Sequence, residues 1–476
     1  MNAPALSVEP VVFALRPGRG AIALHATGFR HPRSGRAGAE RFTAYADLTH
    51  LALGRRTLRI GTRSGLFQIA RKSFAAPDAP EALVRALIER VASEPAGTVQ
   101  LARMAEVEDT ARQPGSPRAT RVLVFACLAA FALQAWLGPG VHHAGFFSAL
   151  LATRGEPWRL VTANLLHAGP THLALNVLGL LALGGLLERT IGSMRTALVA
   201  GLAALGATCA GLLADYDALV GASGIVAGFA GALLWLELRL PERLPAPWRI
   251  PRRPFIVALL ADAALPLFVP EIAGAAHFGG FAAGAFAAAL VTGPNLRRDP
   301  LRPAATVAVA LVLALAGASI GSAARLLLGG AAWETHAKRL LTLEDAPILI
   351  LNDAAWLIAT GRTPTPKALA EARELAQRAV AETGRQDPNL LDTLAEVQFQ
   401  SGDSAGAVET IDEALALAPN ESYITYFTEQ RRRFNGERDR EDRPAPPVGP
   451  FFDSVPDAKP DRIPQRGFEE DPGIPI

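Results

Sequence analysis

The sequence predicts an all-α bundle of membrane-spanning helices, flanked by a small N-terminal β-rich (α+β) domain and a C-terminal α-helical domain. The chain has 476 residues, enough for two or three domains, and half of them are apolar. Charge divides the chain in the same way. Basic and acidic residues number 18 and 10 in residues 1–121, 13 and 9 in the apolar middle region 122–330, and 16 and 26 in residues 331–476.

The N-terminal region, residues 1–95, alternates short apolar runs with turns rich in Gly and Arg. The runs VVFAL, AIALHA, LTHLAL, TLRIG and LFQIA favour β-strands, and PDAPEALVRALIERVAS favours an amphipathic helix. We expect a small cytosolic domain, pleckstrin-homology-like in arrangement, whose basic surface contacts anionic lipid and not nucleic acid. A linker is expected at 96–118, and no cleaved signal peptide is expected because a basic start followed by a long apolar run is missing.

Seven apolar segments follow, each close to the length of about 20 residues that a helix needs to cross a bilayer. They must be helices, because lipid offers no other partners to backbone polar groups. The first six make a core, 119–293, and the seventh is an addition. The segments are 119–138, 164–187, 195–214, 220–238, 254–270, 273–293 and 303–323.

Arginines indicate how these segments are oriented. They are concentrated after the second, fourth and sixth segments, whereas the loops after the third and fifth contain no Lys or Arg. Positively charged loops favour the cytoplasmic side of a membrane. We therefore expect the N-terminus to be cytoplasmic, and the odd number of spans places the C-terminal region outside.

Polar residues lie near the outer ends of three of these segments. His172 and Asn176 are four residues apart in the second segment and so share one helical face. Ser223 opens the fourth segment and His277 the sixth. Because the three segments run in the same direction, these side chains are expected to meet in the outer half of the bilayer, where polar groups are costly and indicate function.

Serine beside histidine is the minimum for nucleophilic catalysis, with the imidazole as base. His172, Asn176 and the Ser223 backbone amide are candidate donors to the oxyanion. No third residue is evident to orient His277, so a dyad is predicted. Asp262, in the fifth segment, is interpreted as an interior hydrogen-bonding group or one that contacts a water-filled cavity.

The fourth and sixth segments each contain two glycines whose spacing favours close packing of the two helices. Gly224 and Gly228 repeat at four residues in the fourth segment, and Gly280 and Gly284 do so in the sixth. Such spacing lets membrane helices pack closely. The two cysteines, Cys127 and Cys209, lie in apolar runs, are expected to be buried and form neither a disulfide framework nor a metal site.

These motifs resemble those of the rhomboid intramembrane proteases over residues of about 120–293. The family's G-x-S-G motif matches Gly221, Ser223 and Gly224. Its H-x4-H-x3-N motif matches His167, His172 and Asn176, and its A-H-x2-G-x3-G motif matches Ala276, His277, Gly280 and Gly284. A Trp-Arg pair matches Trp158 and Arg159, and a G-G-x2-E-R-x2-G stretch contains Glu188.

The resemblance implies an intramembrane serine endopeptidase that needs no cofactor or metal. Ser223 and His277 are then the catalytic dyad, and His172, Asn176 and the Ser223 amide form the oxyanion hole. The resemblance gives His167, Trp158, Arg159 and Glu188 a structural role in holding the external loop. Implied substrates are single-span membrane proteins cut near the outer leaflet, and the implied location is a bacterial cytoplasmic (inner) membrane.

The C-terminal region, 335–435, is predicted to be helical. The stretch DPNLLDTLAEVQFQSGDSAGAVETIDEALALAPN is similar to a 34-residue tetratricopeptide (TPR) helix pair, and the residues before it look like a second copy. Such units usually bind peptides or partner proteins; a helical hairpin docked on its own membrane domain is the alternative. Residues 436–476, rich in Pro and charge, are expected to be disordered.

Two other functions compete with proteolysis. One is a non-catalytic rhomboid-like membrane scaffold that holds clients for the TPR-like region. The other is a small-solute transporter with His172, Asn176 and Asp262 along its path, which predicts inverted internal repeats that the sequence does not contain.

Overall fold

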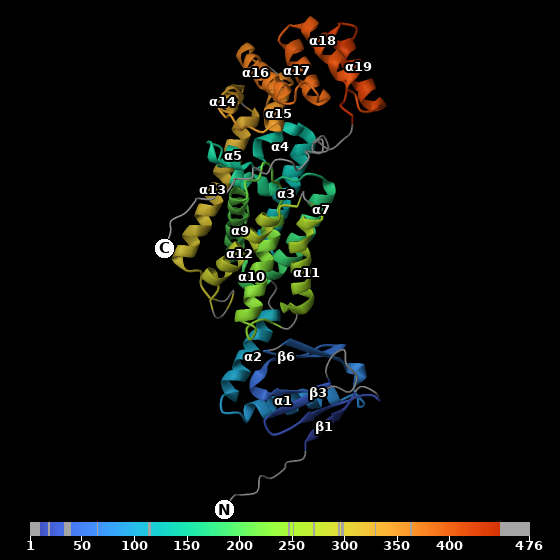
Figure 1. Cartoon of the computed structure of the whole chain (residues 1–476). Helices are drawn as coiled ribbons and strands as arrows, with labels where there is room; N and C mark the ends of the chain where they lie inside the picture. The colour runs from blue at the N-terminus through green and yellow to red at the C-terminus, as the bar shows by residue number, and fades with distance from the viewer. Residues whose placement is uncertain are drawn as a thin grey trace, which may run out of the picture. The chain divides into compact units, whose positions relative to one another are not determined.

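A computed structural model of the chain gives the arrangement of these elements (Figure 1). The structure describes residues 10–17, 20–32, 40–63, 65–112, 116–245, 248–250, 252–269, 272–293, 296, 299–328, 330–361 and 364–447. The chain separates into two units, residues 1–329 and 330–476. The first contains the N-terminal strands and the long apolar helices, and the second contains the C-terminal helices.

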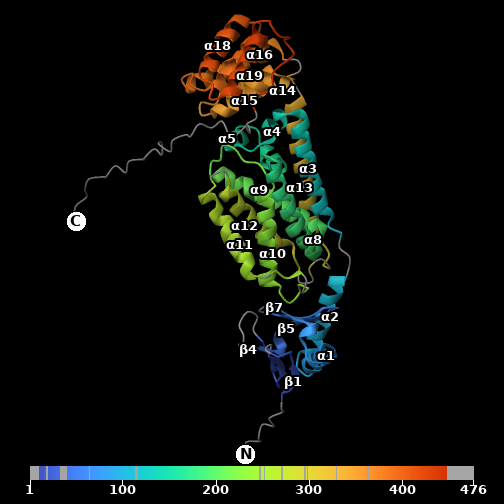
Figure 2. The ribbon, with the colours of Figure 1, turned by 90° about the vertical axis from the view of Figure 1, so that its right-hand side faces the viewer.

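Two antiparallel sheets and two helices make up the N-terminal domain (Figure 2). Ile22, Phe29, Leu58 and Leu83 belong to the buried core between sheets and helix. The first sheet consists of β1 (Val11–Ala14), β2 (Ala21–Leu24), β3 (Gly28–Pro32) and β4 (Glu40–Ala44). The second consists of β5 (Leu48–Leu53), β6 (Thr57–Thr62) and β7 (Gly65–Ala70), and α1 (Ala79–Ala92) follows. The predicted β-rich domain is therefore confirmed, while its likeness to pleckstrin-homology domains stays a prediction.

The predicted linker, 96–118, is wrong over most of its length, because it contains helix α2 (Gly97–Arg112). The buried Gln100 side chain donates hydrogen bonds to the carbonyl oxygens of Tyr45 and Leu48, at 2.8 and 2.9 Å. These bonds satisfy backbone carbonyls where the two sheets meet, so α2 belongs to the N-terminal domain.

His50 is a buried titratable group in this domain, on strand β5. Burial and the nearby Arg249 guanidinium lower the pKa of His50 to about 4. In an unfolded chain a histidine titrates near pH 6.5, so folding requires the neutral ring. The stability that this group contributes is present above pH 6.5 and is lost as pH falls toward 4.

We therefore expect acidification from pH 7 to pH 5 to destabilise this domain by about 2 kcal/mol through His50. The measurement is hydrogen exchange of the β5–β6 peptides in the full-length protein in detergent, corrected for the intrinsic pH dependence of exchange. His50→Gln should reduce the difference between the two pH values, whereas His25→Gln, which leaves His50 in place, should keep it. An unchanged difference in the first variant would refute the assignment.

The membrane region consists of helices that correspond to the seven predicted segments. They are α3 (Arg118–Leu137), α7 with α8 (Pro170–Gly179 and Gly185–Ile191, joined by a π-helical turn), α9 (Ser193–Leu213), α10 (Ser223–Arg239), α11 (Arg252–Ala264), α12 (Gly274–Val291) and α13 (Pro303–Leu328). In the described part of the chain, five are long and apolar enough to cross a membrane: α3, α7–α8, α9, α12 and α13. Helices α10 and α11, with 17 and 13 residues, are shorter than the others. The protein is therefore a multi-pass membrane protein.

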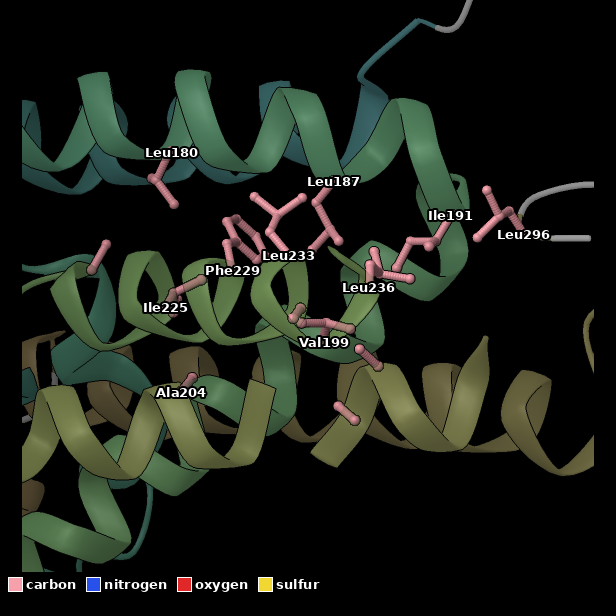
Figure 3. Packing of buried hydrophobic residues seen from close by; sticks show 14 of the residues in the cluster. Leu180, Leu187, Ile191, Val199, Ala204, Ile225, Phe229, Leu233, Leu236 and Leu296 are labelled. Atoms are coloured by element: carbon pink, nitrogen blue, oxygen red, sulfur yellow. The ribbon is translucent and has the colours of Figure 1, made fainter. Parts of the chain in front are cut away.

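Between the first two of these spans, the loop from α3 to α7 contains three short α-helices. They are α4 (Pro139–Gly145), α5 (Ala149–Thr153) and α6 (Arg159–Thr162). At the centre of the bundle, Phe229 and Leu233 of α10 point toward Leu187 of α8 (Figure 3). Phe229 and Leu187 are completely buried, so other helices surround α10. Helix α10 begins at Ser223.

Helices α10 and α12 are in backbone contact, as the glycine spacing predicts. A Cβ atom added at Gly280 would lie 2.1 Å from the carbonyl oxygen of Gly224, and one added at Gly284 would lie 2.1 Å from that of Gly228. No side chain fits between the two helices at these positions. The crossing therefore depends on glycine.

Gly280→Ala is expected to lower the free energy of unfolding by about 1–3 kcal/mol, because a methyl group there must push two backbones apart. Thermal unfolding of the purified protein in detergent would measure this loss. The matched control is Gly317→Ala on α13, where an added Cβ meets no atom within 4 Å. Equal midpoints for the two variants would contradict the proposed packing.

The second unit is helical and consists of α14 (Gly330–Leu341), α15 (Ile348–Ala359), α16 (Pro366–Glu382), α17 (Pro388–Gln400), α18 (Ser404–Ala416) and α19 (Glu421–Phe434). Side-chain caps define several helix starts. Thr365, Asp387, Asp403 and Asn420 each accept a hydrogen bond from a backbone N–H in the first turn of the following helix. The predicted helical domain is present, and its similarity to TPR units stays a prediction.

The start of the predicted disordered tail packs against this unit. The Arg440 guanidinium lies 4.8 Å from the centre of the Phe399 ring, and Arg443 donates to the buried Glu396 carboxylate at 2.9 Å. Disorder is therefore the wrong prediction for residues 436–443. The remainder of the predicted tail from residue 448 onward lies outside the described residues.

Candidate active site

The N-terminal ends of α7, α10 and α12 meet at one end of the bundle. Gly221, two residues before the start of α10, has a φ of +119°, and its N–H donates to the Ala163 carbonyl at 2.9 Å. A Cβ atom there would lie 2.7 Å from the His172 ring and 3.7 Å from the Asn176 amide nitrogen. Glycine is therefore required both by backbone conformation and by the close approach of α7.

Ser223 and His277 start from neighbouring backbones. A Cβ atom on Gly224, the residue after Ser223, would lie 3.7 Å from the carbonyl oxygen of Ala276, the residue before His277. Ser223 is half-buried, and the His277 side chain is 16% exposed. In the described part of the chain the Ser223 hydroxyl makes no hydrogen bond to the His277 ring. Such bonds are often long before substrate binds.

The hydrogen bond of His277 goes instead to Asp262 on α11. Its Nδ1 lies 3.2 Å from the Asp262 Oδ2. An ionised carboxylate only accepts, so this contact favours the neutral tautomer that has the proton on Nδ1 and the lone pair on Nε2. The sequence predicted that Asp262 lies at membrane depth, but it did not predict this contact with His277.

His172 and Asn176 lie beside the Ser223 turn, as expected. Asn176 is buried, and its amide donates to the backbone carbonyl of His172 at 2.9 Å, which leaves it one further N–H. The His172 ring lies edge-on to His167, with ring centres 5.3 Å apart. The backbone of His167 is held by the Gln134 side chain of α3, through bonds of 3.1 and 3.2 Å. Nothing in the sequence indicated that Gln134 would hold the His167 backbone.

A buried ion pair holds the loop between α3 and α7. Arg159 donates through Nε to Glu156 at 2.7 Å, and through Nη1 to the carbonyl oxygens of His143 and Phe146 at 2.7 and 2.8 Å. The Trp158 indole N–H donates to the Ala144 carbonyl at 3.0 Å. Both residues thus donate hydrogen bonds to backbone carbonyls of this loop. Glu156 was not among the residues predicted from the sequence, although its spacing of three residues from Arg159 is typical of an ion pair on one helical turn.

Glu188 lies elsewhere. Its carboxylate accepts from the backbone N–H groups of Ala119 and Thr120, both at 2.8 Å, and from the Thr120 hydroxyl at 2.7 Å. These donors are the first turn of α3, whose N–H groups have no partner within the helix. Glu188 therefore caps α3, and the expectation that it holds the external loop is wrong.

The cysteines take no part in the site. Cys127 is buried and Cys209 is exposed, so the expectation of burial is wrong for Cys209. Within the described ranges, no group of three or more His, Cys, Asp and Glu side chains is arranged to hold a metal ion. The chemistry available at the end of the bundle is a hydroxyl, an imidazole paired with a carboxylate, and amide and imidazole donors.

Comparison with known proteins places this site in a family context. Residues 154–294 match the family model described as a Rhomboid domain. The chain is 33% identical over 161 residues to RHOMBOID-like protein 5 of Arabidopsis thaliana, which covers 32% of this chain and 50% of that protein. It is 34% identical over 145 residues to Rhomboid protease GluP of Bacillus subtilis, covering 30% and 28%.

Rhomboid protease GlpG of Haemophilus influenzae is 29% identical over 136 residues, which cover 27% of this chain and 67% of that protein. The chain spans half or less of the length of the first two relatives. The matched family domain, residues 154–294, lies in the membrane region. Neither the N-terminal domain nor the C-terminal helices lie within the matched family domain. Together, the domain match and these relatives support a rhomboid-family membrane domain in this protein.

Proposed function

We propose that this protein is a serine-type intramembrane endopeptidase that cleaves single-span membrane proteins near the outer leaflet. The observation that carries the proposal is the convergence of α7, α10 and α12, with Gly221 against the His172 ring and Gly224 against Ala276. This packing gathers the hydroxyl of Ser223, the imidazole of His277 and the polar groups of α7 at one end of the bundle. Two of the relatives described above, from Bacillus subtilis and Haemophilus influenzae, are named rhomboid proteases.

In the proposed reaction, the Ser223 oxygen attacks the substrate carbonyl carbon while His277 Nε2 takes the hydroxyl proton. The oxyanion receives hydrogen bonds from the Ser223 N–H, His172 and Asn176. The C–N bond then breaks, and the imidazolium returns the proton to the leaving amine. Water hydrolyses the acyl-enzyme by the same steps, with His277 again as base, and releases the carboxylic acid.

Substrate choice follows from the state of the scissile bond. A spanning helix hides its amides in hydrogen bonds, so cleavage favours segments that contain helix-weakening residues such as Gly or Pro, and a small residue at the cut. The Arg-rich loops favour a cytoplasmic N-terminal domain and an extracytoplasmic C-terminal helical unit in a bacterial inner membrane. The N-terminal domain then contacts anionic lipid, and the TPR-like unit binds a protein partner.

A second candidate is a rhomboid-like scaffold that binds membrane clients without cutting them. The missing hydrogen bond between Ser223 and His277 in the described part of the chain is the observation that favours it. The scaffold requires no reactive serine, whereas the protease does.

Purified full-length protein in detergent, mixed with a single-span substrate, distinguishes the two. The protease proposal predicts two fragments of defined mass with wild type and none with Ser223→Ala. Binding without fragments in both proteins would support the scaffold, and equal cleavage by both would refute the assigned nucleophile. Membrane proteomics that compares cells with wild type and Ser223→Ala would then identify the physiological substrates as ectodomains released only by wild type.

A further inference from the structure

The structure brings a carboxylate to the Nδ1 atom of the proposed base. Asp262 is in the last turn of α11, and His277 is in the first turn of α12, fifteen residues later. The contact joins Asp262 Oδ2 to His277 Nδ1 at 3.2 Å, so it uses the ring nitrogen that the proposed proton transfer does not use. The nitrogen left over, Nε2, is the one that the proposed reaction needs.

Asp262 has no evident packing role. Helix α11 contains no fully buried residue among those described, and the Asp262 side chain is 45% exposed. A carboxylate in a membrane helix costs about 2.5–3.5 kcal/mol at the bilayer centre. A position one turn from the helix end and a hydrogen bond to His277 reduce that cost but do not explain why an acid is present instead of an apolar residue.

The neighbouring helices offer His277 no equivalent carboxylate. On α7 the titratable neighbour is His172, and α9 contributes Cys209, whose thiol is exposed. Glu237 of α10 lies fourteen residues beyond Ser223 and is paired with Arg249 and Arg252. Arg195 of α9 donates to the Val291 carbonyl at the other end of α12, far from His277. Asp262 is thus the acidic group that acts on this ring in the described structure.

We propose that Asp262 is a positioning residue for His277, and that it orients the base of the Ser223–His277 dyad. This inference rests on the proposed protease function. The carboxylate accepts the Nδ1 proton, which holds the neutral ring in the form whose Nε2 lone pair can receive the Ser223 proton. When the ring becomes an imidazolium, Asp262 stays ionised and stabilises it. The proton itself passes only between Ser223, His277 and the leaving amine.

Three substitutions separate positioning from packing. Asp262→Asn keeps the shape, but its amide N–H can donate to Nδ1 and hold the proton on Nε2, the wrong nitrogen. Asp262→Ala removes the partner and leaves Nδ1 to water, so the correct form stays accessible. Asp262→Glu restores a carboxylate. Positioning therefore predicts that Asn is more damaging than Ala and that Glu retains most activity, whereas a packing role predicts that the isosteric Asn is the mildest.

The test measures kcat and KM of full-length protein on the single-span substrate, together with the rate at which a fluorophosphonate probe labels Ser223. We expect kcat and the labelling rate to fall about 10²-fold in Asp262→Asn, with KM and the unfolding midpoint nearly unchanged. The control is Asp215→Asn, a carboxylate between α9 and α10 whose left-handed backbone (φ +52°) asparagine tolerates.

Each outcome decides the question. Activity in wild type with an unchanged kcat and labelling rate in Asp262→Asn would overturn the positioning role while leaving the protease function intact. So would a loss that is larger in Ala than in Asn, or one that follows the unfolding midpoint in all three variants. No cleavage and no labelling of Ser223 by wild type would instead reject the protease function itself.

Discussion

Replacing Ser223 by alanine is expected to lower kcat/KM for a single-span substrate by about 10⁴–10⁶-fold. The variant lacks the oxygen that forms the acyl-enzyme, and His277 has no hydroxyl proton to take. What remains is stabilisation of the oxyanion, which acts only if water attacks in place of serine. The measurement is the initial rate of fragment formation in detergent and in liposomes.

The fold should survive this change, because Ser223 is half-buried and its hydroxyl makes no hydrogen bond in the described structure. The unfolding midpoint of Ser223→Ala should thus equal that of wild type. The matched control is Ser322→Ala on α13, where the serine hydroxyl donates only to Ala318 of its own helix, at 3.0 Å. Loss of cleavage in both variants would show that the assay reports folding rather than chemistry.

Replacing Arg159 by methionine is expected to destabilise the membrane region by about 3–5 kcal/mol. Arg159 is completely buried and Glu156 is 1% exposed. Methionine fills much of the volume but leaves the Glu156 carboxylate and the carbonyls of His143 and Phe146 without the guanidinium donors. Leaving the buried Glu156 charge without the guanidinium costs more free energy than replacing both members of the pair would.

Thermal unfolding in detergent should show a fall of roughly 10 °C for a region of this size. The double variant Glu156→Gln/Arg159→Met should recover part of this fall, because it also removes the buried carboxylate charge that has lost its guanidinium donor. Arg154→Met, at an exposed position of the same loop, should have little effect. A double variant no more stable than Arg159→Met would contradict the ion-pair explanation.

Much of the fold followed from local sequence patterns. Each of the seven predicted apolar segments corresponds to helical structure to within several residues, because a helix in lipid needs only its own residues to satisfy its backbone, and five of these helices are long and apolar enough to cross a membrane. The glycine spacing on α10 and α12 predicted their close approach, because glycines four residues apart lie on one helical face and leave room for a second backbone. Strands β3 and β4 were missed, because GFRHP and ERFTA carry charged and polar residues that hide the apolar alternation.

The site, too, has residues that the sequence could predict and hydrogen bonds that it could not. Ser223, His277, His172 and Asn176 could be named from the sequence, since each sits at a defined depth in a helix whose direction the arginines indicate. That depth brings them to one end of the bundle, where the structure places Gly221 against His172. The sequence could not give the hydrogen-bond partners, which belong to other helices.

Sequence patterns were thus enough to predict where the chain enters the membrane and which polar residues to expect at one end of the bundle. The three-dimensional arrangement was needed to show that Asp262 meets His277, that Glu188 caps α3 and that α2 belongs to the N-terminal domain. The difference arises because hydropathy and helical period are local properties of a segment. A hydrogen bond between two helices depends on their relative rotation and crossing, which the packing of the whole bundle sets.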